Sequence, residues 1–260
     1  MIQFLKIDSF FIGPFQLYTW GIFVALAFLI GLILAVSQAG KVKIEINKLI
    51  TLAILVYLGA MVGARLFFIL QWPVDFLNNP LEFFKFPQGG LMFYGGLLGG
   101  ILAGFLYMRK WGNRRVLIDS LIPIVALSMA VARIGCFLTN DHQGAVTSLF
   151  WAIKWPDGVL RHPVALYLVL FDLALAGLLF LFRKRTHKPG QVTSTSSGQV
   201  FLMFLILYSV GRFLLDFTRE ANSFLADPHY LSLAVSQWIS IFLLAGTIVF
   251  LFLKREKSVA

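Results

Sequence analysis

Long apolar segments that are almost free of charge recur along the whole chain, and such segments are suited to the interior of a bilayer. Lipid offers the backbone no hydrogen-bond partner, so each segment is expected to be a helix. The pattern predicts an all-α polytopic membrane protein with about seven transmembrane helices, forming a single integral membrane domain over residues 1–260. The predicted spans are 17–36, 49–70, 91–108, 116–138, 164–182, 200–217 and 235–253.

The composition supports a membrane protein and argues against a nucleic-acid-binding protein. Hydrophobic residues make up 59% of the chain and charged residues only 13%, whereas soluble domains are about half apolar and a quarter charged. The net charge of +10 comes from short basic clusters between the apolar segments. In a membrane protein such clusters indicate orientation and contact with anionic lipid headgroups, so no nucleic-acid partner is predicted.

The basic residues of the connecting segments predict the topology. Successive connecting segments lie on opposite sides of the membrane, and the segments of one side are much richer in Lys and Arg. This difference places that side in the cytoplasm, the N-terminus outside and the C-terminus inside. An odd number of spans agrees with this assignment. The rich set holds Lys41, Lys43, Lys48, Arg109, Lys110, Arg114, Arg115, Arg183, Lys184, Arg185, Lys188, Lys254, Arg255 and Lys257; the poor set holds Lys6, Lys85, Lys154, Arg161 and Arg219.

Three arginines interrupt the apolar spans. Arg65 lies deep in the second span, and Arg133 and Arg212 lie in the outer halves of the fourth and sixth. A charge near the middle of a span costs about 2.5–3.5 kcal/mol, so each arginine should face the protein interior and have a partner. A structural ion pair is one explanation, since Asp216 follows Arg212 by four residues. Three arginines together favour a bound anion, and at this depth the abundant anion is a phospholipid headgroup.

Polar residues follow Arg133 at the external membrane surface. Asp141, His142 and Gly144 belong to this cluster, which either caps the preceding helix or extends the site. His142 has the intrinsic pKa of a general base, although most loop histidines are simply solvated. His162, just before the fifth span, could extend the same site.

Glycines recur at small-xxx-small spacing through the third span, at 95/99, 96/100 and 100/104. This spacing predicts close packing of helix backbones. Tyr94 lies near the external boundary of the same span, where its hydroxyl needs a polar partner if it is buried.

Cofactor chemistry has no support in the sequence. Cys136 is the only cysteine, which rules out an intramolecular disulfide, and the four histidines lie far apart without the spacing of metal ligands. We therefore predict no metal and no cofactor.

An ordered set of motifs resembles the bacterial phosphatidylglycerol–prolipoprotein diacylglyceryl transferases, from the first span to the last. The motifs are Ile12-Gly-Pro-Phe, Tyr18-Thr-Trp-Gly21, Gly63-Ala-Arg65, Gly89–Gly96, Arg133-Ile-Gly-Cys-Phe137, Gly144, Arg161-His-Pro163, Leu166-Tyr167, Gly211-Arg-Phe213, Asp216-Phe217, Arg219 and Leu231–Gln237. The resemblance implies a multi-pass protein of the bacterial plasma (inner) membrane. Its implied activity is transfer of diacylglyceryl from phosphatidylglycerol to the lipobox cysteine of a prolipoprotein signal peptide, forming a thioether and releasing glycerol phosphate.

The resemblance also implies roles for individual residues. Arg133 and Arg212 match arginines that hold the lipid phosphate, and Tyr94 stands where relatives have histidine or tyrosine. Substrate-binding positions are expected at Arg65, Asp141, Gly144, His162 and Asp216. The chain departs from the family pattern at Thr19, Trp20, Ala132, Cys136, Ala165 and Leu168.

Three questions stay open at this point. The attacking thiol must lose its proton, and Tyr94, His142 or water could accept it. A transporter or flippase for an anionic lipid or solute is the alternative function, which would favour broken helices and a site near the midplane. A relative that binds signal peptides without catalysis is a third candidate.

Overall fold

The computed structural model of the protein describes residues 2–73, 92–141, 143–186, 198–221 and 229–256. Within these residues the chain forms seven α-helices, each overlapping one predicted span, so the all-α polytopic fold is confirmed. The helices are α1 (Thr19–Ala39), α2 (Ile46–Gln71), α4 (Phe93–Met108), α5 (Arg114–Thr139), α6 (Val164–Thr186), α7 (Gln199–Leu215) and α8 (Val235–Glu256). Six of them are long and apolar enough to cross a membrane, whereas α4 has only 16 residues.

Several helices run past the predicted spans into polar sequence. The prediction ended the fifth span at 182, but α6 continues through three basic residues to Thr186. The hydropathy pattern marks only the apolar part of a helix, while the backbone hydrogen bonds continue into the headgroup region.

The chain divides into two compact units, Met1–Ile33 with Ile118–Ala260 and Leu34–Leu117, and each is described by itself. The prediction of one integral domain over residues 1–260 concerns the whole chain and stays a prediction.

Glycines bring α2 and α4 together in the second unit. A Cβ atom on Gly63 would overlap the backbone oxygen of Gly95, and one on Gly99 would overlap that of Gly59. The backbone N–H of Met92 also donates to the carbonyl of Ala64 at 3.1 Å. The close backbone packing that the glycine spacing predicts is therefore confirmed.

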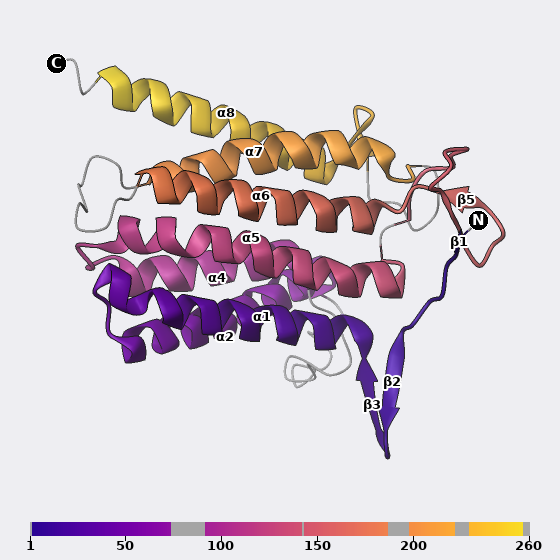
Figure 1. Ribbon diagram of the computed structural model, residues 1–260, viewed down its shortest axis with the longest axis horizontal. Coiled ribbons are helices and arrows are strands. Elements are labelled where there is room, and N and C mark those ends of the chain that lie inside the picture. The colour runs from indigo at the N-terminus through magenta and orange to yellow at the C-terminus, as the bar shows by residue number, and fades with distance from the viewer. Residues whose placement is uncertain (1, 74–91, 142, 187–197, 222–228, 257–260) are drawn as a thin grey trace. The chain divides into compact units, whose positions relative to one another are not determined.

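The core of the first unit lies between α5, α6 and α7, which run side by side in Figure 1. Its buried residues come from all three helices: Ile122, Ala126, Leu175, Ala176, Leu179 and Val200. The start of α1 packs on α5, where Phe23 lies against Gly135. Since α6 runs opposite to α5 and α7, the start of α6 and the ends of α5 and α7 meet at the right-hand end of Figure 1.

Short strands lie at this end of the first unit (Figure 1). The strands β1 (Ile2–Gln3), β4 (Ile153–Lys154) and β5 (Leu160–Arg161) form one sheet, β2 (Ser9–Ile12) and β3 (Phe15–Tyr18) form a hairpin, and β6 (His229–Tyr230) pairs with β7 (Leu233–Ala234). In the first sheet β1 runs parallel to β4, and β5 antiparallel to it. Strands of two to four residues are too short for an alternating pattern to predict them.

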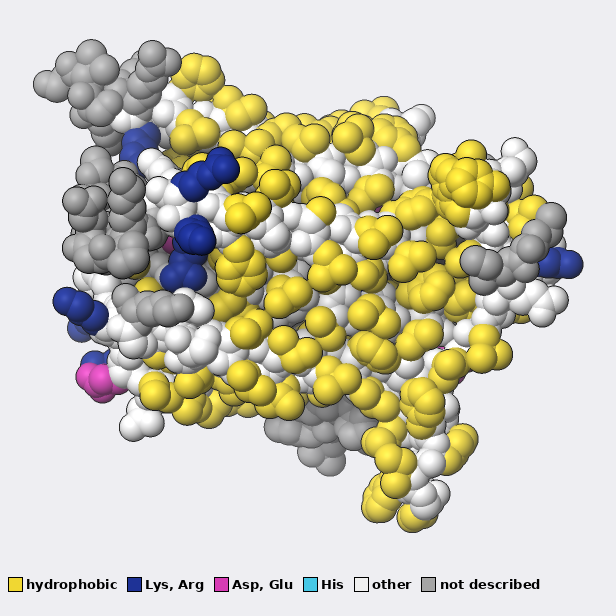
Figure 2. Space-filling model, viewed as in Figure 1, with side chains coloured by type: hydrophobic (Ala, Val, Ile, Leu, Met, Phe, Trp, Pro, Cys, Tyr) yellow, Lys and Arg dark blue, Asp and Glu magenta, His cyan; other side chains and the backbone are white. Residues whose placement is uncertain are grey.

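Apolar side chains cover most of the face shown in Figure 2, and Lys and Arg side chains gather at its left-hand end. Many large apolar side chains on the sides of the helices are exposed, such as Ile33 (59%) and Leu170 (59%). This surface suits lipid contact.

Candidate functional site

Arg212 and Asp216 form a buried ion pair at the end of α7. The Nη2 atom of Arg212 lies 3.1 Å from Oδ1 of Asp216, and Nη1 of Arg219 lies 3.8 Å from the same oxygen. Asp216 begins a 3-10 turn, Asp216–Thr218, that extends α7. The ion pair expected from the four-residue spacing is present. It leaves the Nη1 atom of Arg212 buried without a hydrogen-bond partner among the described residues, so this guanidinium has a donor to offer a ligand.

Arg133 lies in the same part of the first unit. It is half-buried, six residues before the end of α5, and its guanidinium contacts the hydroxyl of Tyr208, one turn before Arg212 on α7. The charges of Arg133 and Arg212 also interact with each other. The structure therefore brings these two predicted residues together from separate helices.

A Schellman motif ends α5 and determines where Asp141 lies. Asn140 has a left-handed backbone (φ 60°). Its backbone N–H donates to the carbonyl of Phe137 at 3.3 Å, and the backbone N–H of Asp141 donates to the carbonyl of Cys136 at 3.1 Å. This part of the polar cluster thus caps the helix, as one of the two interpretations held. Asp141 is exposed, yet partial desolvation by its neighbours raises the pKa of its carboxyl. His142 lies outside the described residues.

Gly144 lies where two chain segments cross. It forms an antiparallel bridge with Arg219. The backbone N–H of the adjacent Ala145 donates to the carbonyl of Thr218 at 2.9 Å, and the Ala145 carbonyl accepts from the N–H of His162 at 3.0 Å. A Cβ atom at position 144 would overlap the carbonyl oxygen of His162. Only glycine fits this close to His162, and the Ala145 backbone ties the loop after α5 to the turn Asp216–Thr218.

Arg161 reinforces this connection. Its Nη1 atom lies 2.8 Å from Oε2 of Glu220, and its Nη2 atom lies 3.1 Å from Oδ2 of Asp157. The Glu220 side chain is 15% exposed and that of Asp157 is 45% exposed, so the first pair is the better shielded from water. The network holds the loop after α5 against the chain that follows α7.

His162 is held by a chain of hydrogen bonds. Trp151 donates its indole N–H to the hydroxyl of Tyr167 at 2.6 Å, and that hydroxyl lies 3.1 Å from Nδ1 of His162. Partial burial lowers the pKa of His162 below its usual value. The imidazole is thus oriented and favoured in its neutral form.

Arg65 and Tyr94 belong to the second unit. Arg65 is 4% exposed, and its guanidinium lies over the ring of Phe68 at 5.5 Å, a cation–π contact inside its own helix. Tyr94 is half-buried with its ring against Phe93. Both residues stay candidates for the site.

Asp172 in α6 is a functional candidate that the sequence analysis missed. Its side chain is 1% exposed, and its carboxylate interacts electrostatically with Arg133 and Arg212. The sequence does mark this residue, because Asp172 is a single acid within an apolar span, and acidic residues in such spans are as unusual as arginines.

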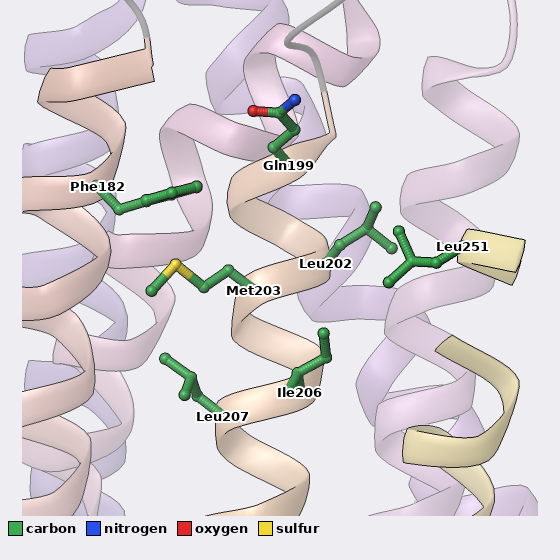
Figure 3. A pocket seen from close by; sticks show the side chains of 7 residues that line it. All are labelled: Phe182, Gln199, Leu202, Met203, Ile206, Leu207 and Leu251. Atoms are coloured by element: carbon green, nitrogen blue, oxygen red, sulfur yellow. The ribbon is translucent and has the colours of Figure 1, made fainter. Parts of the chain in front are cut away.

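A shallow apolar hollow of about 270 Å³ lies at the other end of α7. In Figure 3 its lining side chains come from α6, α7 and α8, namely Phe182, Gln199, Leu202, Met203, Ile206, Leu207 and Leu251. It begins at the first residue of α7, whereas Arg212 lies in the last turn. None of these lining residues has an ionisable side chain.

Comparison with known proteins identifies the family. Residues 8–253 match the family described as prolipoprotein diacylglyceryl transferase. A phosphatidylglycerol–prolipoprotein diacylglyceryl transferase of Bordetella bronchiseptica is 32% identical over 99% of this chain and 100% of its own length. The protein of that name from Clostridioides difficile is 31% identical over 92% of each chain. The family expected from the sequence motifs is therefore confirmed, and the chain belongs to the prolipoprotein diacylglyceryl transferase family.

Proposed function

We propose that the protein transfers the diacylglyceryl group of phosphatidylglycerol to the lipobox cysteine of a prolipoprotein. Its family and the names of its relatives support phosphatidylglycerol and prolipoproteins as substrates in a membrane setting. The same comparisons favour a transferase over the transporter. The structural observation that carries the proposal is that the two positive charges of Arg133 and Arg212 lie close enough to interact. In addition, the Nη1 atom of Arg212 has no hydrogen-bond partner among the described residues.

In this reaction the cysteine sulfur attacks the glycerol carbon that bears the phosphate. A C–S bond forms, the C–O bond breaks, and its electron pair stays on the phosphate oxygen. The thiol proton passes to a base or to water, and glycerol phosphate leaves. Arg133 and Arg212 would hold the phosphate and stabilise the charge that develops on it, as arginine clamps do for phosphoryl groups.

The remaining predicted residues support this site in our proposal. Asp216 orients Arg212 through the 3.1 Å ion pair. Gly144 and His162 shape the loop beside Asp216, and Asp141 follows Thr139, the last residue of α5, by two positions. Arg65 is proposed as a substrate-binding residue and Tyr94 as a catalytic residue, with Tyr94, His142 or water as the proton acceptor.

We further propose that the arginine end of the first unit faces outward from the bacterial plasma (inner) membrane. The distribution of basic residues over the connecting segments supports this orientation, with the N-terminus outside and the C-terminus in the cytoplasm. Lipid and signal peptide would then meet in the outer half of the bilayer, and nucleic acid would have no part.

The test uses purified protein, phosphatidylglycerol and a lipobox peptide, with the mass of the peptide as the readout. The wild type should add one diacylglyceryl mass. Arg133→Ala and Arg212→Ala should each lose about 100-fold or more in rate while accumulating normally in the membrane. Arg115→Ala, which removes an exposed arginine at the start of α5, is the matched control and should keep its activity. Intact wild type that adds no mass would overturn the proposal, and failure of both arginine variants to accumulate would favour purely structural ion pairs.

A further inference from the structure

Asp172 is a buried acid that the proposed chemistry does not use. It lies near the middle of α6 with 1% of its surface exposed, and neither carboxylate oxygen accepts a hydrogen bond from the described residues. Burying a carboxylate without compensation is costly, so its negative charge must be balanced by nearby positive charge.

The packing of α6 on α7 places Asp172 at the same level along the helices as Arg133 and Arg212. The ring of Phe171 lies against Gly211 and 6.4 Å from the ring of Tyr208. Because Gly211 has no side chain, the ring of Phe171 on α6 packs directly against α7 beside Arg212. The Asp172 carboxylate interacts there with the charges of both Arg133 and Arg212.

Five charged side chains make up what we call the arginine cluster: Arg133, Asp172, Arg212, Asp216 and Arg219. Asp216 lies between Arg212 and Arg219 at 3.1 and 3.8 Å. Three positive and two negative charges leave the cluster with one net positive charge. Without Asp172 the net charge would be two.

One positive charge matches the substrate better than the product. The phosphodiester of phosphatidylglycerol carries one negative charge. The phosphomonoester that leaves carries about 1.5–2 negative charges at neutral pH, since its second pKa is about 6. In a buried site, where Coulomb interactions are strong, a mismatch of one charge changes affinity substantially.

We propose that Asp172 is a specificity-determining residue, which sets the net charge of the arginine cluster so that the site holds a monoanionic phosphodiester and releases a dianionic phosphomonoester. The inference rests on the proposed phosphate-binding role of Arg133 and Arg212. Asp172 touches no reacting atom in this proposal and acts through the two arginines.

The first experiment compares Asp172→Asn with Asp172→Glu in the peptide transfer assay. The asparagine keeps the shape of the side chain and removes its charge, so inhibition by added glycerol phosphate should tighten by about tenfold or more. The KM for phosphatidylglycerol should change less than the inhibition constant of glycerol phosphate. Asp172→Glu keeps the charge and should keep the weak product inhibition of the wild type. Glu45→Gln, which removes one exposed carboxylate from the second unit, controls for the net charge of the protein.

A second experiment needs only the wild type and so does not depend on the folding of a variant. As the pH falls below about 6, glycerol phosphate becomes a monoanion and should inhibit more tightly. Glycerophosphoglycerol, a diester that keeps one charge, controls for titration of the protein, and its inhibition should change less over the same pH range.

The outcomes separate this inference from the proposed function. Absence of transfer by the wild type would overturn both. Transfer that depends on Arg133 and Arg212, with product inhibition unchanged or weakened in Asp172→Asn, would overturn only the role of Asp172. The role of Asp172 alone would also be overturned if the wild type bound glycerol phosphate more tightly at higher pH, relative to glycerophosphoglycerol.

Discussion

The carboxylate of Asp119 in α5 accepts a hydrogen bond from the backbone N–H of Gly198 at 2.6 Å, at the start of α7. Its other oxygen accepts from the N–H of Phe201 at 3.0 Å. One helix thus caps the N-terminus of another, and the negative charge also suits the helix dipole. Arg133 follows Asp119 by the same fourteen residues by which Arg212 follows Gly198. Fourteen residues of α-helix span about 21 Å. Because both helices run in the same direction, the contact at their starts sets the two arginines at one depth.

Asp119→Ala is expected to destabilise the protein by about 1–3 kcal/mol, because the part-buried N–H groups of Gly198 and Phe201 lose their acceptors. The measurement is unfolding of the detergent-solubilised protein by denaturant or heat. Glu45→Ala removes an exposed carboxylate whose ion-pair partner, Lys48, is also exposed, and should change stability by less than about 1 kcal/mol. Equal effects of the two substitutions would contradict the capping role of Asp119.

Gly144→Ala is expected to reduce both accumulation and activity. The added methyl group would overlap the carbonyl oxygen of His162, so the chain at position 144 would have to move away from His162. Gly177→Ala on α6 meets no atom within 4 Å and should be neutral or stabilising by up to about 1 kcal/mol. Membrane accumulation and transfer rate are measured for both, and an active, stable Gly144→Ala protein would show that the crossing of the loops can relax.

His162 is expected to carry its proton on Nε2 at neutral pH. Trp151 already donates to the Tyr167 hydroxyl, which leaves that hydroxyl to donate to Nδ1 of His162. Nitrogen-15 NMR of histidine-labelled protein, assigned with His162→Gln, reports both the tautomer and the titration. Tyr167→Phe removes the donor to Nδ1 and should make the tautomer less uniform.

The same titration tests the sign of the pKa shift. Burial lowers the pKa of His162 below its ordinary value of 6.5. As the pH falls through 6.5 the unfolded chain therefore binds its proton first, and the folded protein loses stability until the pH falls below the folded pKa. His162→Gln should reduce this acid-side loss. Titration of His162 at or above 6.5 would contradict the shift.

The sequence predicts most of the helices because crossing a bilayer demands length and apolarity, which any segment displays by itself. It also predicts Arg133 and Arg212, since a charge in an apolar span is conspicuous. Asp172 obeys the same rule and could have been found. The charge balance among these residues depends on which helices touch, and that is a long-range property with no local pattern.

The segments after α5 and α7 contain contacts that the sequence could not predict. The pairing of Arg161 with Glu220 joins residues 59 positions apart, and no spacing rule connects them. The strands at this end are two to four residues long, so alternation cannot mark them. Gly144 was noticed through the family motif, but the reason for the glycine, the approach of the His162 carbonyl, is visible only in the folded chain.

The two ion pairs of Arg161 are expected to differ in strength. Glu220→Gln should lower the free energy of unfolding by about 1–3 kcal/mol, because it leaves part of a largely buried guanidinium without its charged partner. Asp157→Asn should cost less than about 1 kcal/mol, since the Asp157 side chain is exposed. The largest cause of the lowered pKa of Asp157 is the hydrogen bond from the backbone N–H of Val159, and an asparagine at this position can still accept that bond. Unfolding of the two variants in detergent, combined with Arg161→Ala in a double-mutant cycle, measures both couplings. A stronger coupling to Asp157 than to Glu220 would show that the exposed pair, and not the buried one, holds the loop against the chain after α7.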